Sequence, residues 1–100
     1  PKRRVDLTVG ISYGDDIDKA MDLIKAIAAA DERIHKDPEP FVAVANLGDS
    51  AVELVVRVWT NNADYWGVKF AMTKTIKQTF DKEGVSFPFP QRDVHIYQEK

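Results

Sequence analysis

Two hydrophobic periodicities alternate along this chain, and that alternation constrains the fold more than any other feature. Residues 5–11 alternate apolar and polar side chains, a period of two that is typical of a half-buried strand. From residue 16 to about residue 33, apolar side chains instead recur every three or four positions, which predicts one stripe of an amphipathic helix. Strands and helices are therefore interleaved along the chain.

The second half of the chain repeats this change of period. The strand-like runs 41–47 and 51–60 are separated by a turn signal, Gly48-Asp49-Ser50, so we expect an antiparallel hairpin. A second helix pattern follows Asn61-Asn62 and should end at Gly84. The buried face of this helix is predicted to consist of Trp66, Phe70, Thr73, Ile76 and Phe80.

The end of the chain contains two further short runs. Residues 85–90 include Pro88 and Pro90, which cannot donate hydrogen bonds to a sheet, so this run should be an edge strand. Residues 92–98 alternate once more beyond the proline break. A half-apolar strand is not stable alone in water, so this run either folds back onto the domain or pairs with copies from other chains.

The order β-α-β-β-α-β predicts an α+β fold. It is the order of the ferredoxin-like sandwich, in which two helices cover one face of an antiparallel sheet, here with an extra C-terminal strand. We expect residues 1–91 to form the ferredoxin-like domain and residues 92–100 to form the extra strand.

Composition excludes several classes of protein. Of the 100 residues 44% are hydrophobic, which is enough for one packed core. The net charge of −2 argues against nucleic-acid binding, and the absence of cysteine excludes disulfides and thiolate metal sites. No apolar run approaches the roughly 20 residues of a membrane span. The start at Pro1 leads us to expect a fragment of a longer polypeptide.

No group of residues carries a catalytic or metal-binding pattern. Asp15, Asp16 and Asp18 precede or begin a helix, where capping explains them better than a cation site does. His35 and His95 are far apart and lack the further ligands that a metal site needs. We therefore expect no catalytic residue, no metal and no cofactor, and we expect that the protein is not an enzyme.

Aromatic side chains gather where the second hairpin strand meets the second helix. Trp59, Tyr65 and Trp66 could plug the junction between sheet and helix, stack on a ligand, or contact another protein. The sequence favours the first of these interpretations.

Four segments together resemble one family. They are PKRR at residues 1–4, GISYGDDID at 10–18, VVRVWT at 55–60 and GVSFPFPQRDV at 84–94, and the likeness extends over essentially the whole chain. They are similar to the C-terminal, cytosolic part of the small-conductance mechanosensitive channel (MscS) family.

This resemblance implies a function and a location. The full protein would be a homoheptameric channel of a bacterial inner membrane that opens under membrane tension in hypoosmotic shock. This fragment would lie on the cytoplasmic side, in a vestibule that ions and small osmolytes cross through side portals. It would contact the membrane only through the missing N-terminal region, and it would bind no nucleic acid.

The resemblance also implies site residues. Asp6 and Asn46 match positions on the portal rim, and Asn46 stands where a family member carries a carboxylate. The oligomeric barrel strand would contain Asp93, Val94, His95, Ile96 and Tyr97. The alternative, argued from the fold alone, is a regulatory ferredoxin-like domain that binds a small molecule or an ion.

Overall fold

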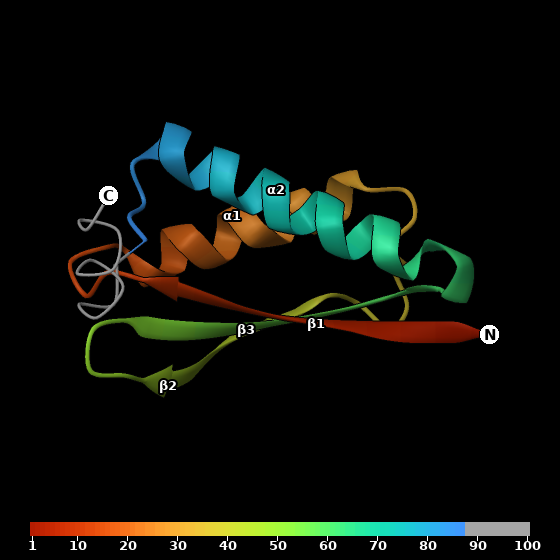
Figure 1. The fold of residues 1–100 in the computed structure, drawn as a ribbon, viewed down its shortest axis with the longest axis horizontal. Helices are drawn as coiled ribbons and strands as arrows, with labels where there is room; N and C mark the ends of the chain where they lie inside the picture. The colour runs from red at the N-terminus through yellow and green to blue at the C-terminus, as the bar shows by residue number, and fades with distance from the viewer. Residues whose placement is uncertain (88–100) are drawn as a thin grey trace, which may run out of the picture.

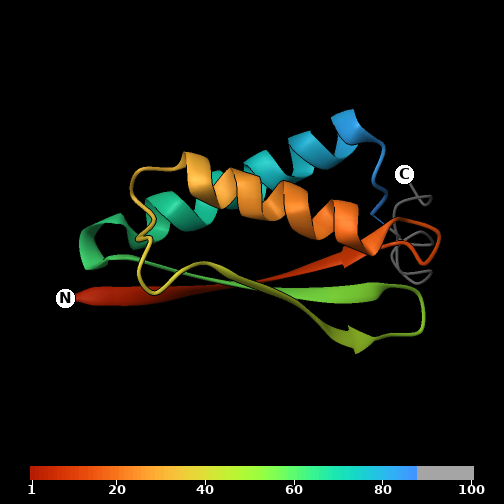
Figure 2. The ribbon, with the colours of Figure 1, turned by 180° about the vertical axis from the view of Figure 1, so that it is seen from behind.

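The computed structural model describes residues 1–87, which form one sheet with two helices on one of its faces (Figures 1 and 2). The elements are β1 (Lys2–Ile11), α1 (Ile17–Ala30), β2 (Phe41–Leu47), β3 (Val52–Asn61), the short 3₁₀ helix η1 (Asn62–Asp64) and α2 (Tyr65–Glu83). The expected α+β class with both helices on the same side is confirmed for these residues.

The described strands form an antiparallel sheet in the order β1-β3-β2, so β3 is central. The ladder between β1 and β3 runs without interruption from the pair Lys2–Asn61 to the pair Ile11–Val52. The expected hairpin is β2–β3, and its pairing shifts by one residue between Val44 and Asn46. This order is the one that a ferredoxin-like sheet has in its first three strands.

The expected fourth strand is not present in the described part of the chain. Residues 85–87 have no strand structure, although the amide of Ser12 donates to the carbonyl of Ser86 at 3.3 Å, beside the end of β1. The remainder of that run, and all of residues 92–100 with the expected barrel residues 93–97, lie outside the described residues.

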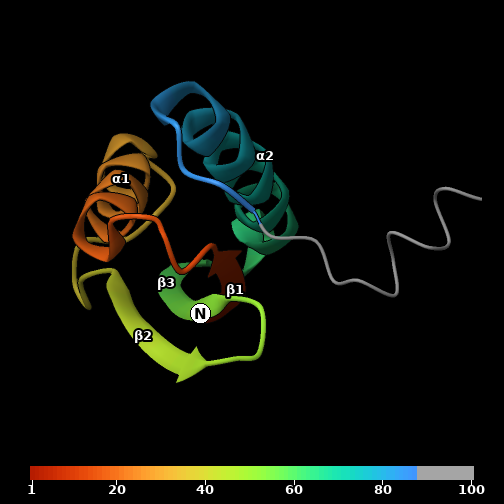
Figure 3. The same ribbon diagram turned by 90° about the vertical axis from the view of Figure 1, so that its left-hand side faces the viewer.

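The core lies between the sheet and the helix layer (Figure 3). Alternate residues of β3 face the helices, and each of them is buried because β3 has a strand on either side. The core includes side chains from β1 (Val5, Val9, Ile11), from β3 (Val52, Leu54, Val56, Val58, Thr60), from α1 (Ala20, Ile24, Ala28) and from α2 (Val68, Met72, Ile76, Phe80).

Acidic side chains at the start of α1 act as caps, as expected. The Asp16 carboxylate accepts from the amide of Lys19 at 3.1 Å, which satisfies a free N–H of the first turn. The Asp15 carboxylate accepts from the amides of Ser12 and Ser86 at 3.1 and 2.9 Å.

The second helix ends where the sequence predicts. Gly84 ends α2 with φ +81°, a left-handed conformation that glycine adopts without steric cost.

The predicted buried face of the second helix is wrong at its first two turns. Trp66 and Phe70 are 56% and 64% exposed, and Thr73 is exposed as well. The stripe that faces the core is instead Val68, Met72, Ile76 and Phe80, at regular spacings of four. Phe70 precedes Ile76 by six residues, which turns it about a third of a turn away from this stripe.

Candidate functional site

The helix-free face of the sheet carries both residues assigned to the portal rim, and we call it the open face. On β3, the residues between the buried ones point to this side, and their neighbours on β1 do so too. The open face is formed by Arg4, Asp6 and Thr8 of β1, Phe41, Ala43 and Asn46 of β2, and Glu53, Val55, Arg57 and Trp59 of β3.

Asp6 forms an ion pair with a neighbouring arginine on this face. Arg4 Nε and Nη2 contact the two carboxylate oxygens of Asp6 at 2.8 and 3.1 Å, which is the bidentate geometry of a strong ion pair. Arg57 stands opposite Asp6 in the ladder, and its guanidinium carbon lies 5.8 Å from the centre of the Phe41 ring. The negative charge of Asp6 is therefore paired with the positive charge of Arg4.

Asn46 reaches the open face because of the irregularity in β2. Val42 and Val44 pair with buried residues of β3, so an uninterrupted strand would turn Asn46 toward the helices. The register shift after Val44 places Asn46 opposite Glu53 instead, and its Nδ2 donates to Glu53 Oε1 at 3.4 Å. A hydrophobic period alone does not reveal such a bulge, so no signal in the sequence predicts this orientation.

Asp6 and Asn46 share the open face but do not meet. Asp6 is on β1 opposite Arg57, whereas Asn46 is on β2 opposite Glu53, with the central strand between them. Glu53 and Arg57 are four positions apart on β3, a distance of about 13 Å along an extended strand. The face thus carries two separate polar pairs, Arg4–Asp6 and Asn46–Glu53.

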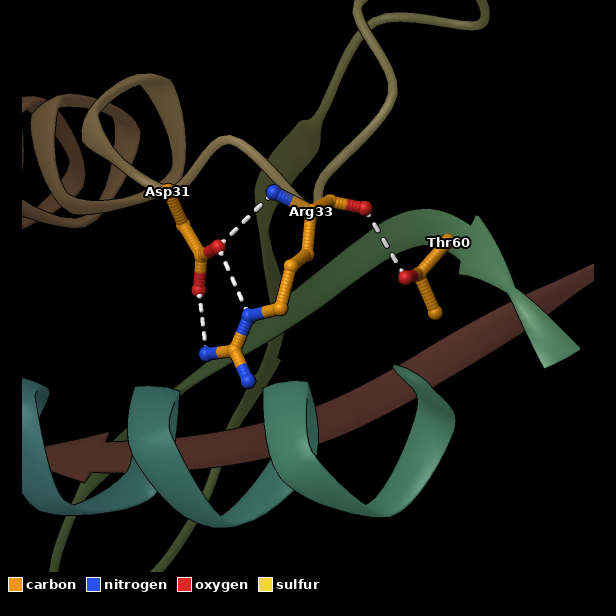
Figure 4. A network of polar contacts seen from close by, with 3 residues as sticks. All are labelled: Asp31, Arg33 and Thr60. Carbon is orange, nitrogen blue, oxygen red and sulfur yellow. Dashed lines mark hydrogen bonds and ion pairs between the residues drawn. The ribbon is translucent and has the colours of Figure 1, made fainter. Parts of the chain in front are cut away.

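A second polar group ties the loop after α1 to the end of β3 (Figure 4). Arg33 donates through Nε and Nη2 to the two oxygens of Asp31 at 3.0 and 2.9 Å, and its backbone amide adds a bond of 2.9 Å. The side-chain hydrogen bond from Arg33 is the main reason that the pKa of Asp31 is lowered. The same contact raises the pKa of Arg33.

The carbonyl of Arg33 accepts from the hydroxyl of Thr60 at 2.9 Å, and Thr60 is fully buried. The Arg33 guanidinium also approaches α2 closely, since a Cβ atom built on Gly67 would lie 2.9 Å from Nη1. His35 continues this connection: its amide donates to the Trp59 carbonyl at 2.8 Å, and its Nε2 lies 3.0 Å from Asn61 Oδ1. These contacts hold the chain in place and leave no reactive group free.

Two hollows lie in the helix layer and beside it. The larger, about 730 Å³, is an open groove between α1 and α2 with Leu23, Ile27, Ala71 and Met72 among its lining residues and the Asp31–Arg33 pair at its end. The smaller, about 330 Å³, is lined by Lys25, Lys36, His35 and Glu39 with an apolar floor. Within residues 1–87, no three acidic or histidine side chains converge as metal ligands.

The aromatic residues at the strand–helix junction divide between two surfaces. Trp59 is half-buried on the open face, next to Arg4 in the ladder, whereas Trp66 projects from the first turn of α2. Trp66 does not plug the junction, so this expectation is wrong for Trp66.

Among residues 1–87, neither α-helix has an apolar stretch sufficient to span a lipid bilayer.

Comparison with known proteins identifies relatives of this chain. The family described as "Mechanosensitive ion channel MscS, C-terminal" matches residues 5–87. An uncharacterised MscS family protein of Synechocystis is 40% identical, and a small-conductance mechanosensitive channel of Edwardsiella ictaluri is 42% identical, each over 98% of this chain. The chain spans about a third of the length of these curated relatives, 33% and 34%.

A solved structure shares the fold. The crystal structure of Helicobacter pylori MscS in its closed state superposes with a TM-score of 0.82 at 28% sequence identity. The match covers 88% of this chain and 35% of that one.

Proposed function

The chain belongs to the MscS family of mechanosensitive ion channels, and from that premise we propose that it forms part of the cytosolic vestibule of a channel that opens under membrane tension in hypoosmotic shock. The observation that carries this proposal is the family match over residues 5–87 together with the fold shared with a solved MscS channel. In this proposal the fragment does not itself conduct ions, and its role in the vestibule is assembly and solute filtering.

The open face supports a role at the vestibule portals. A portal selects solutes by its width and by the charges along its rim. Asp6 and Asn46 both project from the helix-free side of the sheet, where helices do not cover them. With Asp6 balanced by Arg4, such a rim would favour neither cations nor anions strongly, and small osmolytes would pass with the permeating ions.

Assembly is assigned to the end of the chain. We propose that residues 85–90 complete the ferredoxin-like sheet at the free edge of β1, a placement supported by the bond between Ser12 and Ser86 at that edge. Residues 92–100 would then join the same segment of other subunits in a β-barrel of the heptamer, with residues 93–97 as its strand. Closing such a barrel leaves no strand edge exposed.

We propose the location on the basis of the same family. The assembled channel would be an integral protein of the bacterial inner membrane with this domain on the cytoplasmic side. Contact with the lipid would be made by the polypeptide upstream of Pro1, and nucleic acid would not be a partner. Since the relatives are channels, we propose no catalytic activity and no cofactor.

Expression of the full-length gene in a bacterium without its own mechanosensitive channels tests the proposal. We expect the gene to restore survival after an osmotic downshock and to give currents in membrane patches when suction is applied. A well-expressed, membrane-inserted protein that never opens under suction would contradict the proposed function.

Deletion of residues 93–100 from the full-length protein tests the assembly role. We expect the truncated subunits to reach the membrane, because residues within 1–87 already form a packed core. Native mass spectrometry should show a heptamer that dissociates at lower temperature than the intact one. Deletion of only residues 99–100 is the matched control, and equal thermal stability of all three proteins would argue against a barrel.

A further inference from the structure

The smaller of the two hollows, about 330 Å³, lies between α1 and the connection that leads from α1 to β2. We call it the lysine hollow. Its lining includes Lys25 and Ala28 of α1 and Ile34, His35, Lys36 and Glu39 of the connection. Figure 2 shows this connection passing from the end of α1 down to the sheet. Pockets that hold small molecules begin at about this volume.

The wall opposite α1 is fixed to the end of β3. Ile34 forms an isolated antiparallel bridge with Thr60. The amide of His35 donates to the carbonyl of Trp59 at 2.8 Å, and its ring Nε2 lies 3.0 Å from Asn61 Oδ1. These bonds order the connection in the absence of any ligand. A ligand that enters the lysine hollow therefore has little loop ordering to offset.

The floor of the lysine hollow is apolar. Ala28 and Ile34 are buried, and Ala29 and Pro40 also line the hollow. A hydrocarbon group that covers this floor leaves water, which stabilises the bound state in proportion to the apolar area buried.

The charged groups of the lysine hollow are exposed and available. Among the ion pairs of residues 1–87, none involves Lys25, Lys36 or Glu39. Two ammonium groups thus stand against one carboxylate, and this surplus of positive charge favours an anion. The larger groove between the helices differs, because the charged side chains Asp31 and Arg33 at its end already bind each other.

We propose that the lysine hollow is a binding site for a small organic carboxylate. The hydrocarbon part of the ligand covers the apolar floor, and its carboxylate accepts charge-assisted hydrogen bonds from the ammonium groups of Lys25 and Lys36. A neutral hydrocarbon would gain only the floor, and an inorganic anion would gain only the lysines. The lysine hollow shares no residue with the open face, so this site goes beyond the proposed function and does not depend on it.

Three probes test the site in a nuclear magnetic resonance titration of the 100-residue chain, which contains its own packed core. Benzoate carries a ring and a carboxylate, benzyl alcohol carries the ring without the charge, and inorganic phosphate carries charge without a ring. We expect benzoate to shift the amide signals of Ala28, Ala29 and His35 to saturation, with a Kd of about 1 mM. Benzyl alcohol and phosphate should each bind at least about tenfold more weakly.

Paired substitutions test the two lysines. The double variant Lys25→Met and Lys36→Met removes both positive charges of the hollow and should weaken benzoate binding about tenfold. The double variant Lys74→Met and Lys82→Met is the matched control, since these lysines are exposed on α2, outside the hollow, and the net charge changes equally. We expect it to change the Kd less than about twofold. Ala29→Leu fills the hollow, retains the lysines and should also weaken binding.

Four results would overturn the inference, and the first two need no variant. Benzoate might leave the amides of the hollow unshifted, or benzyl alcohol or phosphate might bind as tightly as benzoate does. Equal losses in the two lysine double variants would show that overall charge alone attracts the anion. The fourth result comes from thermal unfolding of the full-length channel, which benzoate should stabilise more than benzyl alcohol does. Stabilisation confined to the 100-residue chain would show that the hollow is covered in the assembled protein.

Discussion

At the scale of single residues, Thr60 shows how one hydroxyl fixes a connection between distant parts of the chain. It is buried at the end of β3 and donates to the carbonyl of Arg33 in the loop that follows α1. Replacing Thr60 by valine keeps the shape but leaves that carbonyl without its donor. We expect Thr60→Val to lower the free energy of unfolding by about 1 to 2 kcal/mol, measured by urea denaturation.

The control for Thr60 keeps the hydroxyl. Thr60→Ser loses one methyl group and retains the donor, so its cost should be about 0.8 kcal/mol from lost burial. If Thr60→Val proved as stable as the parent chain, the bond to Arg33 would contribute nothing.

Asp31 makes the folding stability of the domain depend on pH. Its pKa is lowered in the folded state, so the folded state binds this proton less readily than the unfolded state. The contribution of Asp31 is therefore fully present above its ordinary pKa of 3.8 and is lost as pH falls through the lower folded value. We expect the stability difference between the parent and Asp31→Asn to be constant above about pH 5 and to shrink below it.

Thermal unfolding between pH 7 and pH 2 measures this difference. Asp81→Asn removes an exposed ion pair with Lys77 and is the matched control, since such pairs contribute little. A stability gap between parent and Asp31→Asn that stays constant down to pH 2 would contradict the role given to Arg33.

At the scale of elements, α2 separates two phenylalanines that the sequence alone had grouped together. Phe80 is fully buried in the core, whereas Phe70 is 64% exposed on the outer side of α2. In the 100-residue chain we expect Phe80→Ala to cost about 3 to 5 kcal/mol, because it leaves a cavity. Phe70→Ala should change the free energy of unfolding by less than about 0.5 kcal/mol. Urea denaturation of both variants distinguishes the two faces of α2. Similar losses in the free energy of unfolding would mean that Phe70 is buried, as the sequence predicts.

One strand and two helix boundaries could be predicted closely because their signals are local, whereas the expected strand at residues 85–90 is not found in its described part. The run 41–47 coincides with β2, Asp16 caps α1 and Gly84 ends α2, each through chemistry within a few residues. The face of α2 could not be predicted, because an aromatic and an aliphatic stripe share Ile76 and Phe80. Only packing against the sheet decides between such stripes.

The candidate site could be predicted from the sequence less completely than the fold. In β1, Val5 and Leu7 face the core and Asp6 between them points to the other side of the strand, so its outward orientation follows from the period of two. Asn46 has the parity of the buried Val42, and only the bulge turns it outward. The pairing of Asp6 with Arg4 depends on side-chain conformation, which a pattern of residue types does not contain.

At the scale of the whole assembled channel, an open face that lines the portals, as proposed, would give opposite effects of two substitutions. Asp6→Asn removes the carboxylate that pairs with Arg4, so permeating anions should be favoured. Asn46→Asp adds a carboxylate opposite Glu53, so cations should be favoured. We expect reversal potentials in a salt gradient to shift in opposite directions, by a few millivolts each.

The two variants control each other, because any general damage to the vestibule would act in the same direction in both. Unchanged reversal potentials in both would mean that ions do not pass the open face.

The ladder between β1 and β3 joins residues that are far apart in the sequence, since Lys2 pairs with Asn61. During synthesis β1 leaves the ribosome first and stays unpaired until β3 has been made. The strands β2 and β3 are adjacent in the sequence, so they can pair as soon as both have been made. We expect the hairpin to nucleate refolding and β1 to add late, so Val9→Ala should mainly accelerate unfolding while Val56→Ala slows folding in stopped-flow measurements. Equal kinetic signatures would indicate that the strands collapse together. If the expectation holds, every newly made subunit passes through an interval in which the first strand is open to misassociation with its neighbours on the polysome.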